Sequence, residues 1–541
     1  MPESGDRAPV GAAAVPRRRA RGWVLAAFAG SLAIYALGAA PTVLDRDSGE
    51  LQSVALTAGV AHTTGYPTYA LVGWVFGKLL PGDPAGRINL MSACFGAVAL
   101  ALLVVVGLEL SLAPVIAFAG AMVFGAGFSY WAGALRAEVY TLAVTLFLLG
   151  YWRTLVAFRT DRGRDRVLAA LLLGLSLTVH LACAPTVAVL GLSLAWRALR
   201  SRRALREWPV LVLAFAVGLT PYLHIVWADT HGTPVNFLVH ADKVFFPETG
   251  VPTGPFASPW YRLWWLLTGR NDLPGAPSPI VPWNVLRTLV WSPPLIVLFE
   301  LGPLATLLAI PGFLAFRREN RVEADRIAVL AAASLAFSVT VVAGSLLPLF
   351  MFYAMAPVSL LIGRGLAAVV PPRLTAGRPW ALPLAAGLLM LMPHAIRVWS
   401  YTHPIGPKRW TVLEEDASRP FRLLRRFDRP YAARDFGLGA LAAIPPGALV
   451  VGEWRELPIL YYYCLVLGRR SDLTFQPWTE PSIRVAVRSW ERRHDLARNP
   501  VVYLTLPRET RPVVAEPDSI EVVPGRWIHV SRAPLLTVSA P

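Results

Sequence analysis

The sequence predicts an α-helical, polytopic membrane protein with about 11 transmembrane helices and a C-terminal soluble α/β domain. Three observations lead to this prediction. Of 541 residues, 55% are hydrophobic and 16% charged, with a mean hydropathy of +0.50, whereas soluble domains average about 25% charged residues. The apolar residues also form runs of about 20, the length that crosses a bilayer. Finally, the last part of the chain alternates short predicted strands with helices.

The apolar runs define the predicted spans, because a bilayer core of about 30 Å needs about 20 helical residues. The run from residue 167 to 196 is the least regular and reads either as two short helices meeting near His180 or as one long broken helix. The predicted spans are Gly22–Ala40, Ile88–Leu108, Pro114–Trp131, Glu138–Phe158, Val167–Val179, Leu181–Trp196, Trp208–Trp227, Pro293–Phe316, Ile327–Leu347, Leu349–Val370 and Ala381–Trp399.

Arginines collect around alternate spans, and this placement predicts the orientation of the chain. By the positive-inside rule the face that carries them is cytoplasmic. The basic residues 1–21 then lie in the cytoplasm and the C-terminus lies outside, so much of the formal charge of +17 is a topology signal. The clusters are Arg17, Arg18, Arg19 and Arg21; Arg159, Arg162, Arg164 and Arg166; Arg197, Arg200, Arg202, Arg203 and Arg206; and Arg317, Arg318, Arg321 and Arg326.

The first span could be a cleaved signal peptide, since small residues end it. Its length and Pro41 immediately after it favour an uncleaved anchor. The three cysteines, Cys94, Cys183 and Cys464, are far apart and predict neither a metal site nor a disulfide framework. A pI near 10.3 would suggest a nucleic-acid binder if read alone, but the apolar surplus argues against a soluble one.

Three regions are predicted outside the membrane, all on the exoplasmic side. They are a first loop at residues 41–87, a longer loop at 228–292, rich in Pro and Trp, and the soluble domain at 400–541; the membrane domain covers 22–399. Within the soluble domain we expect strands at Ala448–Trp454, Asp472–Phe475, Val501–Leu506 and Ile520–Val530, and helices at Glu456–Leu467 and Pro481–Asn499. The second of these helices is amphipathic, with Arg484, Arg488, Arg492 and Arg493 facing outward.

The densest polar chemistry lies directly after the first span. Asp45, Asp47 and Glu50 are followed by His62 and Tyr66, at a predicted membrane–water boundary. Carboxylates near hydrocarbon cost free energy, so a cluster there requires an explanation.

Two explanations fit this cluster. Asp47 and Glu50 have the spacing of a capping box ahead of an apolar helix, although that reading leaves Asp45, His62 and Tyr66 unexplained. Alternatively, an ionised carboxylate at a helix N-terminus could take the proton from an acceptor hydroxyl as a general base. Asp47 and Glu50 could instead hold a divalent cation, and spacing does not decide between these two roles.

A family resemblance supports the functional explanation. Asp47-Ser48-Gly49-Glu50-Leu51, Gly59-Val60-Ala61-His62, Gly65-Tyr66-Pro67, Arg87-Ile88-Asn89-Leu90, Ala137-Glu138-Val139-Tyr140, Gly174-Leu175-Ser176-Leu177-Thr178-Val179-His180 and, in the tail, Gly452-Glu453-Trp454 carry it. The sequence resembles the bacterial domain of unknown function 2723 family, related to transmembrane protein 260. It departs from that family at Thr63 and Thr64, where prolines are usual, and at Val179, where Asn is common.

That family resembles the GT-C membrane glycosyltransferases, and the resemblance implies a function. It implies a catalytic acid in the first exoplasmic loop and a polyprenyl-phosphate sugar as donor, with a protein or glycan as acceptor. Asp47 would be the catalytic base or metal-bound acid, with Glu50 or Asp45 as its partner. His62, Tyr66, Arg136, Glu138 and His180 would line the donor site.

Several of these residues also have plain structural explanations. Glu138 could simply be a favourable acid at a helix N-terminus, paired with Arg136, and His180 could be a satisfied core histidine. For His224, Asp229, His231 and the segment Arg270-Asn271-Asp272 a structural role is favoured. The tryptophans of the long loop fit an interfacial belt better than a sugar platform; they are Trp260, Trp264, Trp265, Trp283 and Trp291.

The sequence therefore predicts an exoplasmic glycosyl transfer at a bacterial-type plasma membrane. A transporter or flippase of lipid-linked sugar is the main alternative, but transporters place ionisable groups near the middle of the bilayer, whereas these acids lie at helix ends. A non-catalytic membrane scaffold is the third possibility. No phosphate-binding glycine loop, zinc helix or paired-cysteine motif supports other chemistry.

Overall fold

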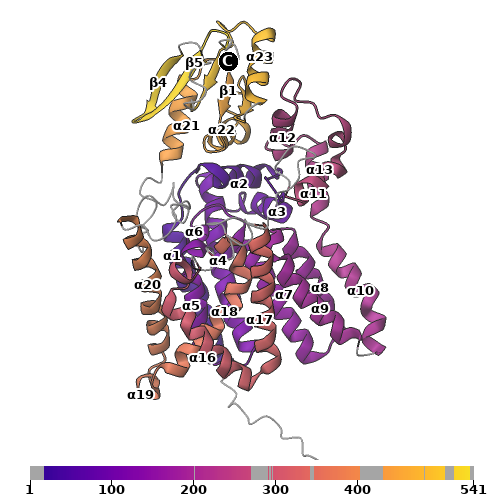
Figure 1. The fold of residues 1–541 in the computed structure, drawn as a ribbon, viewed down its shortest axis with the longest axis vertical. Coiled ribbons are helices and arrows are strands. Elements are labelled where there is room, and N and C mark those ends of the chain that lie inside the picture. Colours follow the sequence, from indigo (N-terminus) through magenta and orange to yellow (C-terminus); the bar gives the residue numbers. More distant parts are fainter. Residues whose placement is uncertain are drawn as a thin grey trace, which may run out of the picture.

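The computed structural model describes residues 17–199, 202–269, 296–341, 347–402, 431–479, 482–505 and 517–535, with the single residues 290, 294 and 514. Long apolar helices form a bundle, and a small C-terminal sheet domain stands beyond one end of it (Figure 1). Two short helices, α2 (Arg46–Thr57) and α3 (Pro67–Phe76), lie between the bundle and that domain. The predicted architecture of a multi-pass helical membrane protein with a C-terminal α/β domain is confirmed.

A helix occupies the described part of every predicted span. The helices of the bundle are α1 (Arg17–Gly38), α4 (Pro84–Glu109), α5 (Pro114–Gly125), α6 (Phe128–Ala134), α7 (Tyr140–Thr160), α8 (Gly163–Leu177), α9 (Ala184–Leu199), α10 (Arg202–Gly218), α16 (Pro303–Glu319), α17 (Arg321–Val341), α18 (Leu347–Val369) and α20 (Ala381–Thr402). Among the described residues, five helices are long and apolar enough to cross a membrane, or six if α5 and α6 form one broken span. The number of crossings, eleven, therefore stays a prediction.

The predicted span Pro114–Trp131 is wrong as a single helix, because it bends by 79° between α5 and α6. The bend is fixed from outside the helix. The buried Glu300, in the short π-helix η3 (Ile296–Glu300), accepts a hydrogen bond of 2.9 Å from the backbone N–H of Ser129, in the first turn of α6. The guanidinium of Arg397 lies 3.3 Å from the ring centroid of Phe128. These two ionisable side chains inside predicted spans thus hold the start of α6.

The region from 167 to 196 consists of two helices, which is one of the two alternatives that the sequence left open. α8 ends at Leu177, and a 3₁₀ turn, η1 (Leu181–Cys183), leads into α9. Arg197 near the end of α9 lies 3.8 Å from Asp161, which precedes α8. Because the end of α9 returns to the beginning of α8, the two helices form an antiparallel pair with His180 at their junction.

Three of the arginine clusters meet at one end of the bundle, called here the arginine end. Arg166 of α8 forms ion pairs with Asp161, which follows α7, and with Glu207 of α10. These pairs join the connection after α7 to α10. Arg326 of α17 lies over the ring of Phe158 in α7. The α2 end of the bundle is the opposite one, so the geometry agrees with the separation of charge that the sequence predicts.

A small helical unit beside α2 and α3 begins at the end of the predicted span Trp208–Trp227 and continues into the long loop (Figure 1). It comprises α11 (Tyr222–Thr230), α12 (Phe237–Phe245), the 3₁₀ turn η2 (Gly254–Ala257) and α13 (Pro259–Leu267). Its core includes Phe256 and Trp265, which are 2% and 1% exposed. Trp260 and Trp264 are exposed, so the predicted belt is wrong for Trp265, which packs inside the unit; Trp283 and Trp291 lie outside the described residues.

The C-terminal domain is a five-stranded sheet in the order β2-β1-β3-β5-β4 with helices on both faces. β1 pairs in parallel with β2 and β3, whereas β5 is antiparallel to β3 and β4. Side chains alternate between the faces, as strand geometry requires: Val450 and Val502 pack towards α21 and α22, and Val451 and Tyr503 towards α23. The elements are α21 (Ala432–Ala443), β1 (Leu449–Gly452), α22 (Leu457–Tyr461), the π-helix η6 (Tyr462–Val466), β2 (Thr474–Pro477), α23 (Ser482–Arg493), β3 (Val501–Tyr503), β4 (Asp518–Val523) and β5 (Arg526–Ser531); a one-turn helix, α19 (Pro372–Thr375), precedes α20.

Candidate functional site

The predicted site residues lie at the α2 end of the bundle, where the first loop meets the C-terminal domain. Glu50 and His62 form its centre. The Glu50 side chain is 2% exposed, its Oε1 accepts a hydrogen bond of 2.7 Å from the backbone N–H of His62, and its Oε2 contacts the Nδ1 of the same residue. Both carboxylate oxygens of Glu50 are therefore engaged by one histidine.

This pair determines the charge of the histidine. Burial alone would lower the pKa of His62, but the charge of Glu50 and its hydrogen bond, with the charges of Asp47 and Glu138, raise that pKa to about 9. Burial in turn raises the pKa of Glu50 against the effect of His62. At neutral pH His62 is thus protonated and places a positive charge beside the carboxylates.

A capping box would place Asp47 at the N-cap of the helix that carries the acids, but this helix begins before Asp47. α2 starts at Arg46 with Asp45 at its N-cap, and the Asp45 side chain makes no capping hydrogen bond. Asp47 lies inside the first turn, and Glu50 faces His62 instead of the helix start. The capping-box explanation is therefore wrong. Gly49 is needed here because a Cβ at this position would lie 2.3 Å from the carbonyl oxygen of Leu44.

Asp47 is exposed, unlike Glu50, and its contact comes from the other end of the chain. The indole Nε1–H of Trp454 donates a hydrogen bond of 2.7 Å to its Oδ1. Asp45 also interacts with the C-terminal domain: burial lowers the pKa of Arg526, and the charge of Asp45 opposes that shift. The charge of Asp47 thus acts on both Glu50 and His62, whereas the charge of Asp45 acts on Arg526.

Arg136 and Glu138 approach the same centre from the connection between α6 and α7. The Nε of Arg136 lies 3.2 Å from the Oε1 of Glu138, which is 8% exposed. Burial raises the pKa of Glu138 to about 7, while Arg136 and a hydrogen bond from Ser48 of α2 oppose the shift and the charge of Asp47 adds to it. A buried carboxylate poised near neutral pH is typical of functional sites.

Tyr66 and His180 add stacked aromatic rings to the site. Tyr66 is at the N-cap of α3, and its ring stacks on that of His180 with centroids 5.6 Å apart. His180 is buried, and its Nδ1 accepts from the backbone N–H of Ala182 at 3.3 Å. Tyr140 also contacts His180, with ring centroids 5.1 Å apart. His180 therefore has the packed, hydrogen-bonded surroundings of a core histidine while touching a site residue.

Three residues of the site were not predicted from the sequence: Phe237, His240 and Trp454. The ring of Trp454 lies 6.2 Å from His62, 5.7 Å from Phe237 and 5.0 Å from His240. Gly452-Glu453-Trp454 was a signal, since it is part of the resemblance. Nothing in the sequence connects Phe237 and His240 with His62 of the first loop, which lies about 175 residues earlier.

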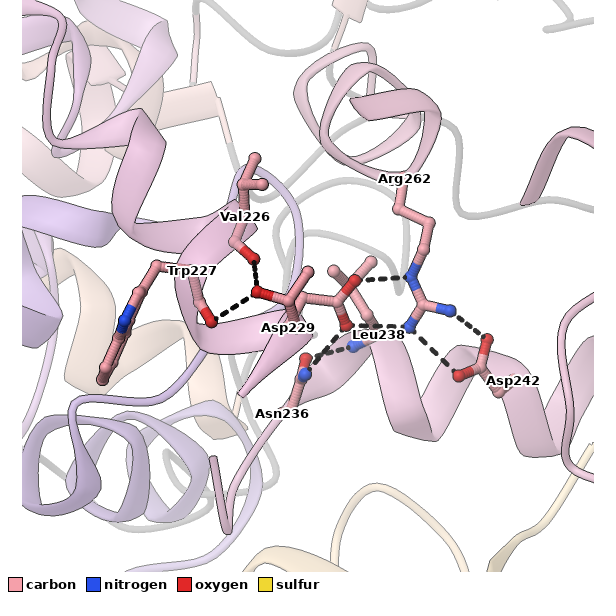
Figure 2. A network of polar contacts seen from close by, with 8 residues as sticks. Val226, Trp227, Asp229, Asn236, Leu238, Asp242 and Arg262 are labelled. Carbon is pink, nitrogen blue, oxygen red and sulfur yellow. Dashed lines mark hydrogen bonds and ion pairs between the residues drawn. The ribbon is translucent and has the colours of Figure 1, made fainter. Parts of the chain in front are cut away.

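Asp229, one of the residues for which a structural role was favoured, has such a role in the long loop (Figure 2). Arg262 is buried between two carboxylates, with Nε 2.9 Å from Asp229 and Nη1 2.9 Å from Asp242, and Asn236 also donates to Asp229. This network ties α11, α12 and α13 together. His224 binds the carbonyl oxygen of Ala58, whereas Arg270, Asn271 and Asp272 lie outside the described residues.

The network also places Phe237 and His240 at the site. The segment before α12 is bonded to the loop before His62, since Val60 N donates to Val235 O at 3.1 Å and Phe237 N donates to Val60 O at 2.9 Å. Asn236, which belongs to this segment, is held by Asp229 of the network. Arg262 thus supports the site without touching it.

Arg262→Met is expected to destabilise the protein by about 3 kcal/mol, because it leaves two buried carboxylates without their cation. Thermal unfolding in detergent would measure the loss. Arg317→Met is the matched control: its ion pair with Asp325 is about 40% exposed on both sides, so the expected loss is within about 0.5 kcal/mol. Equal losses in the two variants would contradict the structural role of Arg262.

The geometry of Asp47 and Glu50 does not favour their binding a divalent cation. Both oxygens of Glu50 already accept from His62, so Glu50 and Asp47 do not present an open pair of ligands. Across the described part of the chain, no group of three or more His, Cys, Asp or Glu side chains could hold a metal ion.

Comparisons with known proteins agree with this fold. Residues 47–204 match the family described as the N-terminal domain of protein O-mannosyl-transferase TMEM260. The mouse protein O-mannosyl-transferase TMEM260 is 31% identical over 258 residues, which are 43% of this chain and 36% of that protein. The Dictyostelium discoideum protein of the same name is 38% identical over 69 residues, 12% of this chain and 8% of that one. The chain thus matches about a third of the mouse protein's length.

Solved structures resemble the whole fold. The crystal structure of ArnT from Cupriavidus metallidurans in the apo state superposes with a TM-score of 0.54 at 12% identity, covering 95% of this chain and 98% of that one. The structure of the same protein bound to undecaprenyl phosphate gives the same TM-score and coverage at 13% identity. This similarity confirms the GT-C-like fold that the family resemblance implied.

Proposed function

We propose that this chain is a membrane glycosyltransferase of GT-C type that transfers a sugar from a polyprenyl-phosphate-linked donor to a hydroxyl group of a protein. One observation carries the proposal: an exposed carboxylate, Asp47, lies beside the Glu50–His62 pair at one end of an ArnT-like bundle. The names of the TMEM260 relatives favour mannose and a protein acceptor, and the ArnT structure with undecaprenyl phosphate favours a lipid phosphate carrier.

The side chains suggest how the transfer would proceed. Asp47 takes the proton of the acceptor hydroxyl while the hydroxyl oxygen bonds to the anomeric carbon of the sugar. The bond between that carbon and the phosphate oxygen breaks, and the lipid phosphate leaves with the electron pair. Arg136 and the protonated His62 supply positive charge for the leaving phosphate. Glu50 keeps His62 protonated and oriented.

An apolar cavity supports a lipid-linked donor. It has a volume of about 340 Å³ and lies between α1, α5, α6 and α20. Trp131 of α6 lines it, and the chain reaches Arg136 and Glu138 shortly after this residue. The proposed donor would therefore have an apolar space for hydrocarbon close to the charges that bind its phosphate.

We infer that the site faces the exoplasmic side of a bacterial-type plasma membrane. The arginine end of the bundle supports this orientation, because the positive-inside rule places it in the cytoplasm. The α2 end and the C-terminal domain then lie outside. On this assignment the N-terminus is cytoplasmic.

Transfer by the purified protein tests the function. Reconstituted in vesicles with polyprenyl-phosphate mannose and an acceptor peptide rich in Ser and Thr, the protein should form a mannosyl peptide and release polyprenyl phosphate in equal amounts. Movement of the lipid-linked sugar across the vesicle membrane without a new glycosidic bond would instead identify a transporter. Neither activity, in protein that unfolds cooperatively, would favour a scaffold.

A further inference from the structure

The C-terminal domain touches the start of α2 at several points. The backbone N–H of Arg46 donates to the carbonyl oxygen of Arg455 at 3.4 Å, and Trp454 donates to Asp47 at 2.7 Å. A Cβ on Gly49 would lie 3.2 Å from the Cβ of Pro458, so α2 and α22 pack closely. The contacts made by Arg455 and Pro458, just after Trp454, hold its loop against the first turn of α2.

Trp454 occupies a favourable position in its own domain. It follows β1, whose neighbours β2 and β3 both run parallel to it. Loops at the carboxyl ends of parallel strands are the usual place for functional side chains in such sheets. Strand β1 itself is fully buried, so the loop that carries Trp454 begins from a rigid element.

The first loop and the long loop contact Trp454 as well. His62 and His240 meet it edge to face, with ring centroids 6.2 Å and 5.0 Å away. Lys243 of α12 donates to the carbonyl oxygen of Phe475 in β2 at 2.8 Å. Both loops are therefore joined to the domain that presents the indole.

We propose that Trp454 is a positioning residue for Asp47 and that the C-terminal domain, by supplying it, completes the site. This proposal rests on the proposed function. The indole N–H fixes the orientation of the Asp47 carboxylate, so that the carboxylate faces an acceptor hydroxyl instead of rotating in solvent. Trp454 itself takes no part in proton or sugar transfer.

Trp454→Phe tests the proposal, because it keeps an aromatic ring and removes the N–H. We expect kcat for transfer to fall about tenfold, the scale of one hydrogen bond to a charged group, with the KM for the lipid donor changed less than twofold. Trp490→Phe is the matched control: it removes an indole hydrogen bond, to the carbonyl oxygen of Asn499, within the same domain. This control should keep the wild-type kcat. A kcat within twofold of wild type in Trp454→Phe would overturn the proposal.

A second measurement examines the contact without relying on activity. The thermal stabilities of Trp454→Phe, Asp47→Ala and the double variant form a cycle. If the two side chains are bonded, the double variant should lose less stability than the sum of the single variants. Strict additivity would show that the contact is absent and would also overturn the proposal. If the stabilities of the Trp454 and Asp47 variants are not additive but the protein transfers no sugar, the contact is established and the proposed function is rejected.

Discussion

Asp47→Asn is expected to reduce sugar transfer at least 100-fold, the lower part of the range of about 10²–10⁴ that general acid–base catalysis contributes. The amide keeps the size of the side chain and can still accept from the indole of Trp454, but it cannot take a proton from an acceptor hydroxyl. Because Asp47 is exposed, the fold should tolerate the change. Initial rates with the lipid-linked donor would measure the loss.

Asp83→Asn is the control for this substitution. Asp83 lies in the same loop and caps α4 through a hydrogen bond from the backbone N–H of Gly86 at 2.9 Å. Asparagine is an equally good N-cap residue, so transfer should stay near the wild-type rate. An Asp47→Asn rate within tenfold of wild type would reject Asp47 as the base.

Glu50→Gln is expected to change how stability depends on pH. In the wild type the pKa of His62 is raised from 6.5 to about 9, so the protonated pair stabilises the folded state fully below about pH 6.5. This contribution is lost as the pH rises through 9. The variant, which lacks the carboxylate, should be less stable than wild type by about 3 kcal/mol at pH 6.5 and nearly equal to it above pH 9.

Thermal unfolding at pH 6.0, 7.5 and 9.0 would test this expectation. Glu207→Gln is the control, because Glu207 pairs with Arg166 at 2.7 Å and an arginine stays charged throughout this pH range. Its difference from wild type should not vary with pH. If the stability of Glu50→Gln changes with pH in the same way as that of the wild type, Glu50 does not hold the proton on His62.

Local patterns in the sequence predicted much of the fold. The apolar runs located the bundle helices, and short segments between helices located the strands, because both depend on neighbouring residues; the segment Ile520–Val530 contains two strands, β4 and β5, instead of one. The bend after Gly125 could not be predicted, since Glu300 and Arg397, far along the chain, fix it. The burial of Trp265 likewise depends on its packing against Phe256, with ring centroids 5.3 Å apart.

The candidate site was predicted in part for the same reason. Asp47, Glu50, His62 and Tyr66 lie close together in the sequence, so the pattern in the first loop was visible. The pairing of Glu50 with His62, in place of a capping box, depends on how the chain turns after α2. The contributions of Phe237 and Trp454 come from tertiary contacts, which no local pattern encodes.

The bond between Asp47 and Trp454 joins side chains 407 positions apart. Ribosomes make the first partner early and the second near the end of synthesis, and domains generally fold in the order in which they emerge. On the proposed orientation, Asp47 therefore lacks its contact with Trp454 until the last domain has been translated, moved across the bilayer and folded. If the proposed role of Trp454 holds, a chain that lacks the folded C-terminal domain should transfer sugar about tenfold more slowly, the effect expected of Trp454→Phe.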